Sequence, residues 1–218
     1  MISETSNNSE WTGLRGRIMA WYLNSPFRRL SEVLFLGDGR SRVLAEVTAA
    51  LKGEGTVLDV GAGSGYFSLA IAQKLKQGKV ICLDLSKEML QRLRQLANKR
   101  GLADKVQMLE GSASRIMLDD GVVDVAIANG VFHELVDPAV VLQEMVRVLR
   151  PGGAIIVTDF RADTWIGRRV ASAHRSEDHG PFGRQELEKL FLDVSLRDVR
   201  VSAVRHIVVG VGIKAEAA

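Results

Sequence analysis

The stretch VLDVGAGSGYF at 57–67 is the part of the sequence whose residue types and spacing point most clearly to ligand binding. An apolar run ends at Asp59, and three alternating glycines follow before a helical pattern begins: Gly61, Gly63 and Gly65. Glycines permit a tight turn and let a ligand approach the backbone, while the start of a helix presents amides that have no helical partner. The stretch therefore predicts a ligand site between a strand and a helix.

The spacing of these glycines separates two kinds of ligand. A dinucleotide fingerprint has the spacing GxGxxG, whereas this chain has GxGxG and places Tyr66 where the third glycine of that fingerprint would stand. The negative charge of Asp59 beside the turn disfavours a pyrophosphate and favours a ligand that carries an ammonium group. A nicotinamide-dependent oxidoreductase is therefore the disfavoured alternative.

A second acidic residue, Asp84, ends the next predicted strand within ICLDLS at 81–86. Parallel strands end at one edge of a sheet, so we expect its carboxylate beside the glycine-rich turn, where it can accept hydrogen bonds from both hydroxyls of a ribose. The alternative role for Asp84 is a helix N-cap.

The stretch ANGVFHELVDP at 128–138 follows another strand and places Asn129, His133 and Glu134 at the crevice where such sheets bind ligands. A neutral imidazole at His133 could take a proton from a hydroxyl acceptor. The alternative is a histidine that only supports the loop.

The elements that must position these residues alternate between strands and helices. Short β-branched runs lie at 56–60, 80–83, 106–109, 122–128 and 154–158, with helical patterns between them. This order predicts a parallel sheet with crossover helices. Two adjacent strand patterns at 196–201 and 204–213 are close enough in sequence to pair antiparallel, and 161–183 is expected to be an irregular or partly helical crossing.

The first part of the chain differs, because it contains helical patterns at 18–23, 27–36 and 42–51 and no strand pattern. We therefore predict a helical N-terminal extension at 1–54 and an α/β domain at 55–218.

Composition limits the class of protein. Of 218 residues, 46% are hydrophobic and 25% are charged, which suits a globular domain and excludes a disordered or fibrous chain. The net charge is only +3, and the basic residues are spread along the chain, so no nucleic-acid partner is expected. We expect a cytoplasmic protein, because Cys82 is the single cysteine and neither a signal peptide nor a membrane span is recognisable. No metal site is expected, although HRSEDHG at 174–180 holds suitable ligand types.

Four motifs in order resemble the class I, Rossmann-like S-adenosylmethionine-dependent methyltransferases over roughly residues 40–213: VLDVGAGSG (57–65), ICLDLS (81–86), LEGSA (109–113) and LRPGGAIIVTDF (149–160). The resemblance implies a doubly wound α/β fold whose seven-stranded, mostly parallel sheet has an antiparallel last strand. It also implies S-adenosylmethionine as the cofactor.

The resemblance assigns roles to individual residues. It implies that the methionine part of the cofactor is held by Asp59 and the turn residues Gly61, Ala62, Gly63 and Gly65. Asp84 would then bind the ribose. Leu85 would either cover the adenine as an apolar lid or belong to the hydrophobic core. Ser112 and Ala113 would lie against the adenine, with Ser112 standing where many relatives have Asp. Asn129 would contact the cofactor, and His133 would line the methyl-transfer pocket.

A looser resemblance connects WYLNSPFRRLSEVLFLGDGR at 21–40 with the ubiquinone/menaquinone-biosynthesis branch of these enzymes and makes Tyr22 a candidate pocket residue. We expect the N-terminal helices and 161–183 to close over the cofactor, which favours a small-molecule methyl acceptor. A non-catalytic cofactor-binding protein of the same fold is the other alternative.

Overall fold

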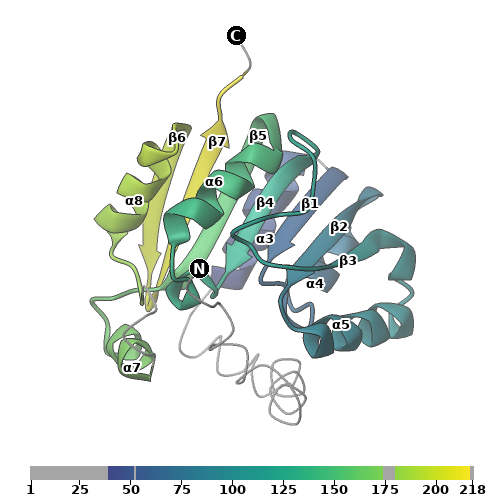
Figure 1. Ribbon diagram of the computed structural model, residues 1–218, viewed down its shortest axis with the longest axis horizontal. Helices are drawn as coiled ribbons and strands as arrows, with labels where there is room; N and C mark the ends of the chain where they lie inside the picture. Colours follow the sequence, from purple (N-terminus) through teal and green to yellow (C-terminus); the bar gives the residue numbers. More distant parts are fainter. Residues whose placement is uncertain (1–38, 52, 174–179, 217–218) are drawn as a thin grey trace.

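A seven-stranded β-sheet forms the centre of the protein in this computed structural model, which describes residues 39–51, 53–173 and 180–216 (Figure 1). The strand order is β3-β2-β1-β4-β5-β7-β6, with the bounds β1 Glu54–Val60, β2 Gln77–Asp84, β3 Val106–Glu110, β4 Val123–Asn129, β5 Leu149–Phe160, β6 Leu196–Val204 and β7 Ile207–Lys214. Only β7 runs antiparallel to its neighbours, β5 and β6. The predicted fold class is confirmed.

Helices cover both faces of this sheet, so the architecture has three layers. Figure 1 shows α6 (Pro138–Val148) and α8 (Arg184–Asp193) in front of the sheet and α3 (Gly39–Leu51) behind it. The face behind also carries α4 (Ser68–Lys74) and α5 (Lys87–Lys99), whose apolar residues share one buried cluster with those of α3. Short 3-10 turns, η2 (Ala103–Lys105) and η3 (Phe132–Glu134), and the helix α7 (Trp165–Ala173) complete the described chain.

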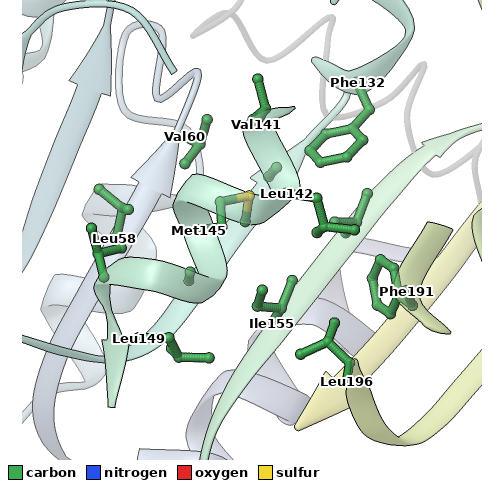
Figure 2. Packing of buried hydrophobic residues seen from close by; sticks show 14 of the residues in the cluster. Leu58, Val60, Phe132, Val141, Leu142, Met145, Leu149, Ile155, Phe191 and Leu196 are labelled. Carbon is green, nitrogen blue, oxygen red and sulfur yellow. The ribbon is translucent and has the colours of Figure 1, made fainter. Parts of the chain in front are cut away.

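The front core shows how sequence spacing sets the packing. In α6, Val141, Leu142 and Met145 recur at helical spacing and are buried toward the sheet, as Figure 2 shows. The helix begins where expected, because the Asp137 side chain accepts a hydrogen bond from the Val140 amide at 3.1 Å and Pro138 occupies the first turn.

The strand β5 is longer than predicted. The sequence predicts a strand at 154–158, yet β5 begins at Leu149 and includes the Pro-Gly-Gly sequence at 151–153. The pairing with β4 shifts register between Val123 and Val125, opposite Leu149 and Ala154. The extra residues of β5 lie at this irregularity, between Leu149 and Ala154. Pro151 has no backbone amide to donate, and at this irregular part of the pairing no ladder hydrogen bond from it is required.

The N-terminal region is described only from residue 39 onward, where Val43, Val47 and Leu51 of α3 pack into the rear core with Val57 and Ile127. The predicted helices at 18–23 and 27–36, and Tyr22, lie outside the described residues, and the boundary between residues 54 and 55 stays a prediction. Across the described ranges, no helix has the length and apolar character that crossing a membrane requires.

Candidate cofactor and methyl-transfer site

The glycine-rich turn after β1 contains glycines with two different functions. Gly61, Gly63 and Gly65 have φ values of 67°, 52° and 87°, a region that favours glycine. A Cβ atom at Gly61 would lie 2.6 Å from Val131, and one at Gly65 would lie 2.7 Å from Leu93, so both positions are required by packing. A Cβ at Gly63 would meet nothing within 4 Å, so this glycine faces open space that a ligand can approach.

Asp84 joins the end of β2 to this turn. Its Oδ2 accepts a hydrogen bond from the Gly63 amide at 2.7 Å, and its Oδ1 accepts one from the Ser86 amide at 2.8 Å. Burial raises the pKa of Asp84, and these two amides oppose that rise. The N-cap of α5 is Ser86, whose hydroxyl accepts from the Met89 amide at 3.2 Å, so the alternative role of Asp84 as the cap is wrong.

Asp59 lies beneath the same turn on the face covered by α4. Its side chain accepts a hydrogen bond from the Ser68 hydroxyl at 2.5 Å, and the residue is only 2% exposed. Burial raises the pKa of Asp59 to about 7; the Ser68 hydrogen bond opposes this rise, and the charge of Asp84 adds to it. A buried carboxylate that is costly to ionise is suited to a cationic ligand, whose charge would stabilise the ionised form.

The residues predicted to surround the adenine lie next to Asp84. The Gly111 amide donates to the Asp84 carbonyl at 3.1 Å, so Ser112 and Ala113 follow directly beyond the edge of β2. The Ser112 hydroxyl lies 2.7 Å from the Ser114 hydroxyl. Leu85 is 55% exposed, so the alternative that it belongs to the core is wrong.

The segment after β3 is held in place from α6. Arg147 donates to the carbonyls of Ile116 and Leu118 at 2.7 and 2.8 Å, and Glu144 accepts from the Ile116 amide at 2.8 Å. A hydrogen bond between Arg147 and Glu144 at 2.7 Å links the two side chains. These contacts fix the backbone that leads away from Ser112 and Ala113.

Two buried donors near the turn have no acceptor within the part of the chain that the structure describes: Asn129 Nδ2 and Arg40 Nε. Asn129 is the last residue of β4 and follows Ala128, which pairs with Val60 just before the turn. The Asn129 Oδ1 atom accepts a hydrogen bond from the Thr158 hydroxyl at 2.5 Å. Leaving such a donor unsatisfied costs about 1–3 kcal/mol. Together with the open space at Gly63, these donors fit a polar ligand with hydrogen-bond acceptors.

His133 lies in η3 and is held by a carboxylate that the sequence reasoning missed. Its Nδ1 is 2.7 Å from Asp159 Oδ1, and its backbone amide donates to Asp159 Oδ2 at 2.9 Å. Because the carboxylate accepts from Nδ1–H, a neutral ring carries its lone pair on Nε2, which lies 3.6 Å from Glu134 Oε1. The signal for Asp159 was present, because it ends an apolar strand just as Asp59 and Asp84 do.

The chain also returns over His133 after α7. The Gly180 amide donates to the His133 carbonyl at 3.1 Å, and Phe182 is buried 6.1 Å from the Phe132 ring, measured between centroids. His133 is consequently only 4% exposed. Residues 174–179, which include most of the HRSEDHG stretch, lie outside the described residues. Among the residues that the structure describes, no three His, Cys, Asp or Glu side chains are grouped so that they could hold a metal ion.

The sheet order and the glycine-rich turn between two acidic strand ends define the Rossmann-like class of methyltransferase folds. The chain belongs to the family described as Methyltransferase domain, which matches residues 51–191. It is thus a member of the S-adenosylmethionine-dependent methyltransferases, whose methyl donor is S-adenosylmethionine.

Individual relatives agree with this family. The demethylmenaquinone methyltransferase of Lactiplantibacillus plantarum is 30% identical over 134 residues, which are 60% of this chain and 56% of that protein. The tRNA 5-carboxymethoxyuridine methyltransferase of Escherichia coli is 34% identical over 107 residues, covering 49% of this chain and 40% of that protein. The chain spans about half the length of the curated relatives it matches.

A solved structure shows the same fold over a longer range. The crystal structure of a methyltransferase from Aquifex aeolicus, described as dependent on the same cofactor, has a TM-score of 0.70 and 26% identity. The match covers 90% of this chain and 97% of that one.

The first prediction concerns Asp84. The change Asp84→Asn removes the negative charge while keeping the shape of the side chain. We expect the affinity for S-adenosylhomocysteine to fall about 10-fold to 100-fold. The reason is that hydrogen bonds to a charged group contribute roughly 1.5–3 kcal/mol each. Titration calorimetry measures this loss. The matched variant Asp104→Asn, at an exposed position in η2, should bind normally. Equal affinity of the Asp84 variant and the wild type would remove Asp84 from the ribose site.

The second prediction concerns pH. Because the pKa of Asp59 is about 7 in the folded chain, this carboxyl is largely protonated at pH 6. A bound ammonium group favours the carboxylate, so binding of S-adenosylhomocysteine should release a proton at pH 6 and release progressively less toward pH 8. Calorimetry in two buffers of different ionisation enthalpy counts this proton. The Asp59→Asn variant should no longer release this proton when the ligand binds. An unchanged proton count in that variant would show that another group releases the proton.

Proposed function

We propose that the protein transfers a methyl group from S-adenosylmethionine to a small-molecule acceptor. The observation that carries this proposal is the meeting, at one edge of the sheet, of the open space at Gly63, the Asp84 carboxylate and the buried His133–Asp159 pair. When bound, S-adenosylmethionine supplies a methyl group activated by its sulfonium centre. The protein's part is to hold the reactants in line and to exclude water.

Different residues of this chain would bind different parts of the cofactor. Asp84 would accept hydrogen bonds from the ribose, Asp59 would face the ammonium group, and Asn129 would donate its unsatisfied Nδ2–H. Leu85, Ser112 and Ala113 would surround the adenine, with the exposed Leu85 side chain becoming covered by it. Two of these roles match groups that are buried at a cost, the Asp59 carboxyl and Asn129 Nδ2, and the role of Leu85 matches its exposed side chain.

A small acceptor is supported by the burial of His133. Phe160 packs edge-on against its ring at 5.2 Å, and the Gly180 backbone binds its carbonyl. With 4% of its surface exposed, His133 is accessible to a compact group entering a covered site and poorly accessible to a folded macromolecule. The relative named as a demethylmenaquinone methyltransferase is consistent with this class of acceptor.

His133 would act as the general base where the acceptor is a hydroxyl. The hydroxyl proton passes to Nε2, and the resulting imidazolium is stabilised by Asp159, whose carboxylate contacts Nδ1 at 2.7 Å. The same carboxylate holds the His133 backbone amide, so Asp159 fixes both the ring and the turn that carries it. Asp159 is therefore a positioning residue in this proposal.

The acceptor class is tested directly with the full chain and S-adenosylmethionine labelled in its methyl group. We expect the label to appear in the low-molecular-weight fraction of a cell extract and not in its RNA or protein fractions. The Asp84→Asn variant serves as the control for cofactor-dependent labelling. Label recovered mainly in RNA would instead favour an activity like that of the tRNA methyltransferase relative.

The role of His133 is tested by two variants once an acceptor is in hand. His133→Gln should lower turnover by about 100-fold and remove the limb of the pH–rate profile that an imidazole produces, while affinity for S-adenosylhomocysteine is retained. Asp159→Asn keeps the shape of the side chain and removes its charge, and we expect it to lower turnover as well, because the imidazolium then loses the carboxylate that stabilises it. His206→Gln is the matched control. An unchanged pH profile in His133→Gln would exclude base catalysis by this residue.

A further inference from the structure

Glu134 is an acidic residue beside the candidate methyl-transfer site that none of the roles above uses. It follows His133 in η3, and its Oε1 atom lies 3.6 Å from His133 Nε2. The Glu134 side chain is 28% exposed, whereas the His133 side chain is 5% exposed. The carboxylate is therefore the more accessible of these two neighbouring groups to an incoming molecule.

The turn η3 that carries both groups lies against the glycine-rich turn. A Cβ atom at Gly61 would lie 2.6 Å from Val131, the residue directly before η3. Asp159 fixes η3 from the other side, because it accepts a hydrogen bond from the His133 backbone amide at 2.9 Å and contacts the ring nitrogen Nδ1 at 2.7 Å. Nε2 and Oε1 are thus held next to the turn that is proposed to bind the cofactor.

These two atoms can accept hydrogen bonds from two donors of one molecule. With its Nδ1–H donated to Asp159, a neutral His133 ring offers a lone pair at Nε2, and the Glu134 carboxylate offers only acceptor oxygens. Hydrogen bonds from hydroxyls span about 2.7–2.8 Å. Two hydroxyls on neighbouring carbons can therefore reach Nε2 and Oε1 together across their 3.6 Å separation. A molecule with one hydroxyl reaches only one of them.

Charge and surrounding apolar surface narrow the class of acceptor further. The carboxylates of Asp159 and Glu134 both lie beside the His133 ring, so a carboxylate or phosphate on the acceptor would be repelled. Phenolic hydroxyls remain protonated at pH 7 and so keep both donors. The Phe160 ring, which is half-buried and 5.2 Å from the His133 ring, offers apolar surface to an aromatic body.

We propose that the methyl acceptor is an aromatic molecule with two hydroxyls on neighbouring ring carbons, one bound by His133 Nε2 and the other by Glu134. This inference rests on the methyl transfer and the base role of His133 proposed above. The reacting hydroxyl gives its proton to Nε2 while its oxygen bonds to the methyl carbon, and the sulfur–methyl bond breaks with its electron pair left on sulfur. The second hydroxyl keeps its proton, donates to Glu134 and so determines which oxygen faces Nε2.

The test measures kcat/KM of the full chain with methyl-labelled S-adenosylmethionine and three probes: catechol, phenol and hydroquinone. Catechol has neighbouring hydroxyls, phenol has one, and the two hydroxyls of hydroquinone point away from each other. We expect catechol to be methylated at least about 10-fold more efficiently than either of the others, because only catechol makes the second hydrogen bond. Transfer to catechol should stop after one methyl group, because the product has lost one of its two donors.

Variants of Glu134 test whether this residue causes the preference. Glu134→Ala should abolish the preference for catechol over phenol, and Glu134→Gln, which keeps a neutral acceptor oxygen, should retain part of it. Glu54→Ala, at an exposed position where β1 begins at the opposite edge of the sheet, is the matched control and should keep the full preference. Thermal unfolding of each variant checks that it is folded.

Three outcomes would overturn the proposal. They are equal efficiency for catechol and phenol in the wild type, a preference that survives unchanged in Glu134→Ala, and no label in any probe. If the chain labels none of the probes and still labels the low-molecular-weight fraction of a cell extract, the acceptor class proposed here is wrong and the proposed function stands. A chain that labels neither contradicts the proposed function as well.

Discussion

The hydrogen bond from the Gly63 amide to the Asp84 carboxylate joins the two strand ends on which the site depends. It holds the turn after β1 against the end of β2, where the Ala62 amide also donates to the Leu83 carbonyl at 3.0 Å. The other Asp84 oxygen accepts from Ser86, the residue that caps α5. One carboxylate thereby sets the turn, the following helix and the open side of Gly63 relative to each other.

The polar groups around this junction lower the stability of the ligand-free protein. Asp59 is buried with a raised pKa, and Asn129 Nδ2 and Arg40 Nε are buried without acceptors in the described part of the chain. A ligand that satisfies these groups binds the folded state only and so stabilises it. The same arrangement gives selectivity, because a ligand that lacks a matching group leaves a buried charge or donor unpaired.

Much of the arrangement of the candidate site was predictable, because parallel strands end at one edge of a sheet. Asp59, Asp84 and His133 were identified in this way, and Asp159 carried the same signal at the end of β5. Arg40 was not, since its contact with Tyr66 spans 26 positions and depends on how α3 packs against β7. The early start of β5 was also missed, because a Pro-Gly-Gly sequence normally ends an element and only the irregular pairing with β4 accommodates it here.

A crystal structure of the full chain with S-adenosylhomocysteine tests the central claim most directly. We expect the ribose hydroxyls on the Asp84 carboxylate and the ligand's ammonium group toward Asp59, with the Gly63 backbone against the ligand. A ligand bound with its ribose away from Asp84, or at any place other than the carboxyl ends of β1, β2 and β4, would contradict it.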